Sequence, residues 1–306
     1  MPLDPMIAQL LEMGRDQPKL RDLSIGDARA AMLARVEPLQ PLAPSGIQTQ
    51  DLAIATVAGP LPIRIYRPAG SETPLPVLLW LHGGGWVVGS VDSHDGLCRF
   101  LAKDGPLLVV SVDYRLAPEA RSPAQQQDTL EALRWTVANI ASHGGDAGHI
   151  VIGGDSAGGN LAALAAIAAR DSGGPALAGQ LLVYPVTDFP TDRRASYAPD
   201  GDYGLSREDM LWFWNLWLPE GAAADATTAP LRAADLSGLP PAWVVTAEYD
   251  VLKDEGDEYA AKLAAAGNDV EYESVPAVIH GFFSMAGFVP AATDAVRRAA
   301  RWAATV

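Results

Sequence analysis

Short apolar runs recur along the chain and predict the strands of one sheet. They lie at 51–57, 62–67, 76–82, 107–113, 149–154, 180–186, 241–247 and 269–275. Several, including PVLLWLH and LLVVSVD, are continuously apolar, as strands buried on both faces are. Helical periodicity fills intervals at about 124–141, 157–170, 254–266 and 291–304, and this alternation predicts a mostly parallel sheet with helices on both faces. The first two runs are joined by a short loop and predict an antiparallel hairpin at one edge.

Two regions lie outside this alternation. Residues 1–45 predict two helices, the first capped by Asp4 with Pro5 at its first position, the second at about 25–36. After the run at 180–186, about fifty residues contain no strand, but Ser206 and Asp209 have capping-box spacing. The helix they begin has one aromatic face, which by itself favours core packing: Met210, Phe213, Trp214 and Trp217. We expect 1–45 and 189–225 to form a helical cap, and 46–188 with 226–306 to form the core domain.

The segment IVIGGDSAGGN at 150–160 runs from an apolar strand through a glycine-rich turn into an alanine-rich helix. It contains G-x-S-x-G in the strand, turn and helix context that a nucleophilic serine requires. Glycines at 154 and 158 are expected because larger side chains would collide with backbone in so sharp a turn. The hydroxyl of Ser156 would then lie at a helix N-terminus, which favours negative charge. A glycine-rich phosphate loop also fits the motif alone, so the interpretation depends on partner residues.

A serine hydroxyl needs a base to remove its proton and a carboxylate to hold that base. His280 follows the last predicted strand in VIHGFF, where loops at the end of the sheet gather. Asp250 ends a strand in TAEYDVLKDEG, whereas Asp254 is expected to cap the next helix. The other histidines lie in the glycine-rich loop, in or beside polar loops, or before the nucleophile strand: His82, His94, His143 and His149. The sequence therefore predicts Ser156, Asp250 and His280 as the catalytic group, in the chain order of α/β-hydrolases.

The stretch HGGGWVVG at 82–89 follows an apolar strand and is almost free of side chains. A carbonyl attacked by serine becomes a tetrahedral oxyanion, which needs N–H donors at about 2.7–3.1 Å. Glycines allow backbone amides to approach that oxygen, so Gly84, Gly85 and the amide of Ala157 are the predicted oxyanion hole. We expect His82 to orient this loop through a backbone hydrogen bond.

Composition narrows the class of protein. The 306 residues include 49% hydrophobic residues, which is typical of a globular protein with a full core. The formal net charge of -15 argues against nucleic-acid and anionic-membrane partners, since both attract basic surfaces. Cys98 is the single cysteine, which excludes an intrachain disulfide and a thiolate metal cluster and is expected to be a buried, inert thiol. The N-terminus does not resemble a signal peptide, and no run spans a bilayer, so a cytoplasmic location is expected.

The motifs HGGGW, DYRLAPE, GDSAGG, DVLKDEG and HGF, spread over about 76–282, together resemble the hormone-sensitive lipase-like family of carboxylesterases, in its GDSAG-type branch. The resemblance implies an α/β-hydrolase fold with an eight-stranded sheet and a cap built from an N-terminal segment and an insertion after the sixth strand. It implies hydrolysis of short- to medium-chain acyl esters without cofactor or metal, and often a homodimer. DYRLAPE looks like a structural motif. The family often has proline after the catalytic acid, where this chain has Val251.

The residues and the resemblance together predict a serine carboxylesterase acting on a small-molecule ester. The same catalytic group could hydrolyse amides or lactones, because the leaving-group preference depends on pocket shape. A non-catalytic small-ligand-binding protein is the alternative from a different class, and the presence of His280 argues against it. Six aromatic residues are candidates for lining the substrate pocket: Trp86, Tyr114, Tyr203, Trp212, Phe213 and Phe282.

Overall fold

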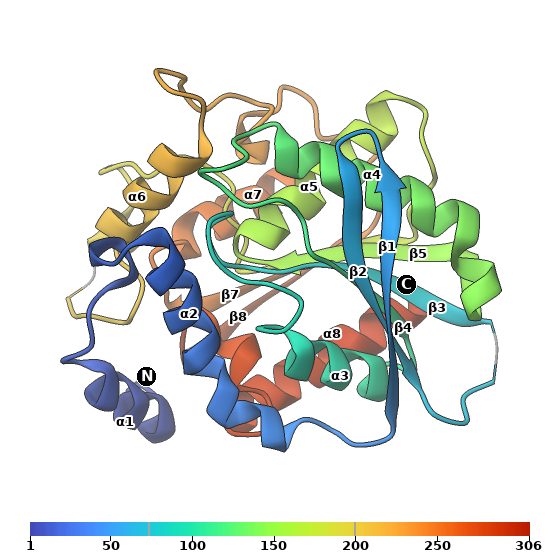
Figure 1. The fold of residues 1–306 in the computed structure, drawn as a ribbon. Helices are drawn as coiled ribbons and strands as arrows, with labels where there is room; N and C mark the ends of the chain where they lie inside the picture. Colours follow the sequence, from blue (N-terminus) through green and yellow to red (C-terminus); the bar gives the residue numbers. More distant parts are fainter. Residues whose placement is uncertain (73, 199) are drawn as a thin grey trace.

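The computed structural model describes residues 1–72, 74–198 and 200–306, with only the backbone at positions 40 and 41. Its eight strands form one sheet in the order β1-β2-β4-β3-β5-β6-β7-β8 (Figure 1). They are β1 (Ile47–Thr56), β2 (Gly59–Pro68), β3 (Leu75–Leu81), β4 (Leu108–Val112), β5 (Gly145–Asp155), β6 (Gly179–Val183), β7 (Ala242–Tyr249) and β8 (Val270–Ile279). Only the pairs β1 with β2 and β2 with β4 are antiparallel. The predicted mostly parallel sheet and its edge hairpin are confirmed.

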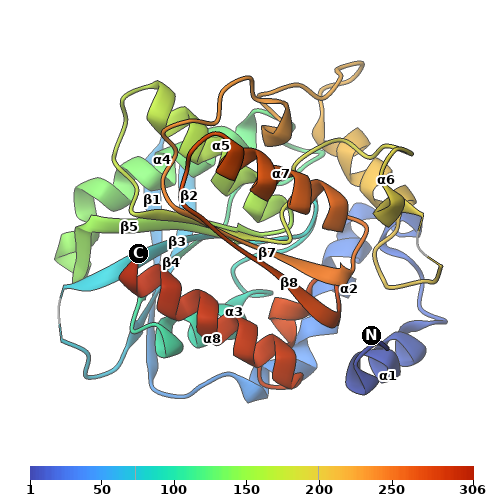
Figure 2. The same ribbon diagram turned by 180° about the vertical axis from the view of Figure 1, so that it is seen from behind.

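Helices cover both faces of the sheet, as Figure 2 shows from behind. They are α1 (Pro5–Gly14), α2 (Ile25–Val36), α3 (Asp95–Asp104), α4 (Ala124–Asn139), α5 (Ala157–Asp171), α6 (Arg207–Trp217), α7 (Lys253–Ala265) and α8 (Pro290–Thr305). Helices α4, α5 and α7 lie on one face, and α3 with α8 on the other. A hydrophobic core lies on each face of the sheet, and successive side chains of β3 pack into opposite cores: Leu79 into one and Trp80 into the other. This double burial explains the continuously apolar runs.

Helix α3 is the element that the apolar pattern did not predict. Its sequence DGLCRFLAKD buries Leu97, Cys98, Leu101 and Ala102. The preceding residue, His94, makes no side-chain cap, so the usual start signal is missing. Two other predicted caps are present: Asp4 accepts from the first amides of α1, and Ser206 with Asp209 forms a complete capping box.

The N-terminal region contacts the insertion between β6 and β7. Arg21 donates to Ser206 at 3.3 Å and forms an ion pair with Asp209, while Lys19 pairs with Asp202 at 2.7 Å. Figure 1 shows α2 and α6 at the same end of the sheet. This arrangement favours the predicted cap, whose boundaries stay a prediction; Pro199, inside the expected insertion, lies outside the described residues. In the described ranges, no helix combines the length and the apolar character needed to cross a bilayer.

Candidate active site

Ser156 lies in the sharp turn between β5 and α5. Its backbone has φ 57° and ψ −118°, a strained conformation for a residue with a side chain. The turn is crowded on both sides: an ideal Cβ on Gly154 would lie 2.4 Å from the Leu81 oxygen, and one on Gly158 only 1.8 Å from it. The predicted steric reason for the two glycines is therefore confirmed. The turn presents the Ser156 hydroxyl at the N-terminus of α5.

The Ser156 hydroxyl is the first member of a chain of three hydrogen-bonded side chains from three different loops. His280 Nε2 lies 3.0 Å from Ser156 Oγ, and His280 Nδ1 lies 2.7 Å from Asp250 Oδ2. The carboxylate only accepts, so Nδ1 carries the hydrogen and Nε2 is left to accept from the serine. The Asp250 side chain is fully buried, whereas that of His280 keeps 15% exposure, so the imidazole borders the open side of the site. The structure thus brings the three predicted residues together with the geometry of a base and its orienting acid.

The Asp250 carboxylate is held from its other side. Its Oδ1 accepts from the Leu252 amide at 2.9 Å, in the turn that leads into α7. The Tyr184 ring packs on the His280 ring with centroids 4.7 Å apart. These contacts fix the acid and limit the rotation of the imidazole.

The glycine-rich loop begins directly after β3, beside the nucleophile turn. The Gly83 amide donates to Asp155 Oδ1 at 3.0 Å, and Gly84 and Gly85 have φ of 119° and 58°. Such angles favour glycine. In the described part of the chain, the amides of Gly84, Gly85 and Ala157 have no hydrogen-bond acceptor. These are the three predicted oxyanion donors, and they are free to bind an oxygen.

His82 lies beneath the loop. Its Nδ1 is 2.8 Å from the Gly83 oxygen, and its ring stacks on Tyr114 with centroids 4.2 Å apart. Burial, with the nearby His94, lowers the pKa of His82 to about 3, so the ring is neutral and Nδ1–H donates. His82 therefore makes the expected backbone hydrogen bond.

Helix α6 packs directly onto the glycine-rich loop. An ideal Cβ on Gly85 would lie 2.2 Å from the Phe213 ring, so the ring fills the space in front of this glycine. Trp86 stacks on Trp217 at 3.8 Å and meets Trp214 edge-on at 5.0 Å. The aromatic stripe of α6 is thus packed, as its pattern favours, and its packing partner is the loop that carries Gly84 and Gly85, two of the predicted oxyanion donors.

The six aromatic candidates lie in different surroundings. Trp86, Tyr114 and Phe282 are buried, and Tyr114 donates to the His82 oxygen at 2.7 Å. Trp212 and Phe213 lie on α6, and Tyr203 lines a cavity of about 440 Å³ beside Asp250. Their contact with substrate stays a prediction.

One prediction about this region was wrong, and one contact in it was not predicted. Asp254 does not cap α7: it lies inside the first turn, and its Oδ2 accepts from the Ser196 amide of the insertion at 2.9 Å. The expectation was wrong because α7 begins one residue earlier, at Lys253. His94, which drew no attention in its loop, lies 3.2 Å from Asp155 Oδ1, next to the nucleophile. This contact could not be predicted from the sequence because the two residues are 61 positions apart along the chain.

Cys98 is buried in α3, and burial raises the pKa of its thiol well above the usual range. This agrees with the expected inert thiol.

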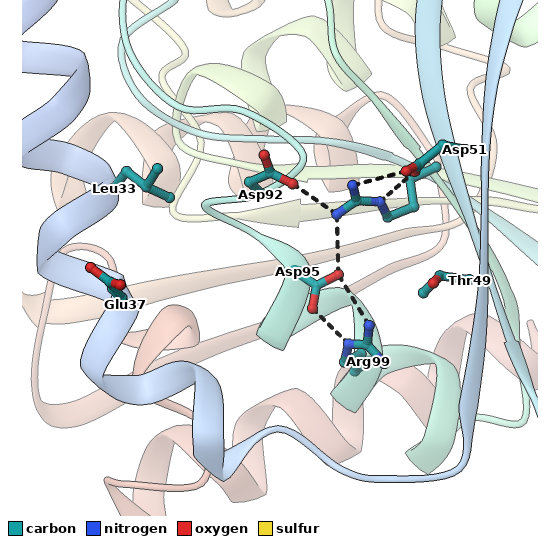
Figure 3. A pocket seen from close by; sticks show the side chains of 8 residues that line it. Leu33, Glu37, Thr49, Asp51, Asp92, Asp95 and Arg99 are labelled. Atoms are coloured by element: carbon teal, nitrogen blue, oxygen red, sulfur yellow. Dashed lines mark hydrogen bonds and ion pairs between the residues drawn. The ribbon is translucent and has the colours of Figure 1, made fainter.

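A second cavity, of about 550 Å³, lies between α2, the edge hairpin and α3 (Figure 3). Arg64 crosses it and pairs with Asp51 at 2.5 Å, Asp92 at 2.9 Å and Asp95 at 3.3 Å. None of the three predicted catalytic residues lines it. Its charges hold the edge hairpin against α3 and are separate from the Ser156 site.

The chain is similar to known proteins along most of its length. Residues 78–284 match the model of a family described by its alpha/beta hydrolase fold. Esterase LipI of Mycobacterium tuberculosis is 41% identical over 97% of this chain and 92% of its own length. An ethyl acetate hydrolase of Pseudomonas putida is 36% identical over 96% of each chain. A hyperthermophilic esterase from the archaeon Pyrobaculum calidifontis has a similar structure, with a TM-score of 0.93, 37% identity, and coverage of 100% of this chain and 99% of that one.

Proposed function

This chain belongs to the hormone-sensitive lipase-like family of α/β-hydrolase esterases, and on that premise we propose that Ser156, His280 and Asp250 hydrolyse short- to medium-chain acyl esters. It is a carboxylic ester hydrolase, as its relatives are. The observation that carries the proposal is the pair of contacts from His280, 3.0 Å to Ser156 Oγ and 2.7 Å to Asp250 Oδ2. A non-catalytic ligand-binding role gives no reason for this arrangement.

In the first step, Ser156 Oγ attacks the ester carbonyl carbon while His280 Nε2 takes the hydroxyl proton. Asp250 accepts from Nδ1–H and stabilises the imidazolium that forms. The carbonyl oxygen becomes an oxyanion that the amides of Gly84, Gly85 and Ala157 bind. The tetrahedral intermediate then breaks its bond to the alkoxy oxygen, which leaves as the alcohol with the proton from His280.

In the second step, water hydrolyses the acyl-enzyme. His280 takes a proton from the water as its oxygen attacks the acyl carbon, and the same amides bind the second oxyanion. The bond to Ser156 Oγ breaks, Oγ regains the proton, and the carboxylic acid leaves. Each residue returns to its starting state.

The test is hydrolysis of p-nitrophenyl esters from acetate to palmitate by the wild type and by Ser156→Ala, His280→Ala and Asp250→Asn. We expect a preference for short chains and a loss of about 10³-fold or more in kcat for the serine and histidine variants. Ser172→Ala and His143→Ala are matched controls, because Ser172 ends α5 and His143 lies near the surface, bonded to Gln50.

Parallel assays with p-nitroanilides and lactones measure the alternative substrates on the same residues. A Ser156→Ala variant with wild-type activity would rule out the nucleophile, and a higher kcat/KM for lactone or anilide would replace the ester assignment.

A further inference from the structure

A buried histidine and carboxylate lie directly behind the nucleophile and take no part in the mechanism above. Asp155 precedes Ser156 at the end of β5, and His94 precedes α3. His94 Nε2 lies 3.2 Å from Asp155 Oδ1 and 3.3 Å from Oδ2, and the two side chains are only 3% and 9% exposed. Buried ionisable pairs are costly to build, so this one calls for a reason.

Asp155 connects His94 to the glycine-rich loop. Its Oδ1 accepts from the Gly83 amide at 3.0 Å, and an ideal Cβ on Gly83 would lie 2.4 Å from Oδ2, so the backbone is pressed against the carboxylate. Gly83 is followed immediately by the two proposed oxyanion donors, and the orientation of one peptide plane sets the path of the next. The Asp155 carboxylate is therefore placed to hold the peptide that leads into those two amides.

The hydrogen bonds around His94 show how it holds Asp155. The carboxylate only accepts, so Nε2 donates to it when it carries a hydrogen, and the Gly83 amide nitrogen also lies 3.3 Å from this Nε2. At the other side of the ring, Nδ1 lies 2.9 Å from Ser93 Oγ. Ser93 has one hydroxyl hydrogen and lies 2.9 Å from the Ser90 oxygen, which can only accept it. Both ring nitrogens of His94 therefore have partners, the Ser93 hydroxyl at Nδ1 and the Asp155 carboxylate at Nε2.

The ionisation of Asp155 agrees with this arrangement. Burial acts to raise its pKa, but His94 and the Gly83 amide outweigh burial, so the pKa is lowered and the carboxylate is charged. In the described residues, the hydrogen-bond partners of the Asp155 carboxylate are His94 and the Gly83 amide. Without His94, the buried carboxylate would lose a hydrogen-bond partner and turn or take up a proton.

We propose that His94 is a positioning residue for ester hydrolysis, which through Asp155 holds the Gly83 amide and so aims the Gly84 and Gly85 amides at the oxyanion. The proposal rests on the proposed function. It predicts that replacing His94 weakens binding of the oxyanion and leaves substrate binding almost unchanged. The reason is that the contacts from His94 lead to those amides and not to Ser156, Asp250 or His280.

The test compares His94→Ala, His94→Gln, Asp155→Ala and Asp155→Asn with the wild type. Each variant is assayed for kcat and KM on p-nitrophenyl butyrate and for the inhibition constant of a trifluoromethyl ketone, whose adduct with Ser156 carries the same oxyanion. We expect both alanine variants to lose about 10²-fold in kcat, as removal of an oxyanion donor does, and a similar factor in ketone affinity, with KM changed less than about threefold.

The amide variants are the conservative partners. Asn at 155 still accepts from the Gly83 amide, and Gln at 94 still donates to Asp155, so each should recover part of the loss seen with alanine. His143→Gln is the control for replacing a histidine elsewhere, since His143 lies near the surface and bonds the Gln50 side chain. Thermal unfolding of every variant is followed in parallel.

The outcomes separate the two proposals. If His94→Ala is folded and keeps kcat and ketone affinity within threefold of the wild type, or raises KM alone, the positioning role is wrong. If His94→Ala does not fold, His94→Gln and Asp155→Asn decide by the same criteria: an equal loss in kcat and ketone affinity supports the role, and unchanged values overturn it. If Ser156→Ala retains activity in the same assay, the proposed function itself fails.

Discussion

An alanine at Gly85 tests whether helix α6 fixes the glycine-rich loop. The new Cβ would lie 2.2 Å from Cδ1 and Cγ of Phe213 and 2.6 Å from Cδ2, so the ring of α6 must move. Gly85 also has φ 58°, which a side chain disfavours. The variant therefore carries two costs, one from the backbone and one from the contact.

The two costs are separable. A left-handed backbone costs a non-glycine residue about 1–2 kcal/mol, and forcing an extra group into a packed site costs about 1–3 kcal/mol. Gly173 supplies the matched control, since it has φ 61° and no atom within 4 Å of its ideal Cβ. Gly173→Ala measures the backbone cost alone, and Gly85→Ala should exceed it by about 1–3 kcal/mol.

A double-mutant cycle with Phe213→Ala completes the test. Removing the ring opens the space that the methyl group needs, so Gly85→Ala should cost no more than Gly173→Ala in that background. The free energy of unfolding is measured by urea titration with tryptophan fluorescence, and kcat/KM on p-nitrophenyl butyrate gives the same cycle for the transition state. Additive effects of the two substitutions, or equal costs at Gly85 and Gly173, would refute the direct contact.

Three further substitutions have defined outcomes. Gly158→Ala would place a Cβ 1.8 Å from the backbone oxygen of Leu81, so we expect a loss of about 3 kcal/mol or more in unfolding free energy, or no soluble protein. Burial raises the pKa of Glu255 to about 8, above its ordinary 4.5, so wild-type stability falls as pH rises between these values. Glu255→Gln does not titrate, and its stability relative to the wild type should rise by a few kcal/mol between about pH 5 and pH 9 in urea titrations; a constant difference contradicts this. Arg194→Met removes the cation that Asp188 and Glu258 share at the base of the insertion, and should lower the unfolding free energy by about 3 kcal/mol, whereas the exposed Arg193→Met should change it little.

The regular part of the fold could be predicted because its physical signal is local. Strands buried on both faces read as apolar runs, and glycine, serine and aspartate mark their ends. Helix α3 was not predicted, although its buried residues follow helical spacing: Leu97, Cys98, Leu101 and Ala102. Its start has no side-chain cap, because the His94 side chain points to Asp155 instead of to the helix amides. The orientation of the His94 side chain thus explains both the missing helix cap and the contact with Asp155.

The site was predictable to the extent that each residue carries its own backbone signature. Ser156 has flanking glycines, and Asp250 and His280 each follow a strand. His94 has no such mark, and it meets Asp155 only because β3 and β5 pair in parallel, with Leu81 opposite Gly154. That register brings the glycine-rich loop beside the nucleophile, and a contact made by register is visible only in three dimensions.

Gly85 has two separate reasons to be glycine, and the sequence revealed only one of them. The need for backbone donors explains a glycine at this position, and its positive φ would be sufficient reason. The structure adds a second reason, because the Phe213 ring occupies the space where a side chain would lie. The same absence of a Cβ therefore leaves an amide available to the proposed oxyanion hole and admits the Phe213 ring of α6. A change in α6 should accordingly act on the proposed oxyanion donors, although α6 supplies none of them.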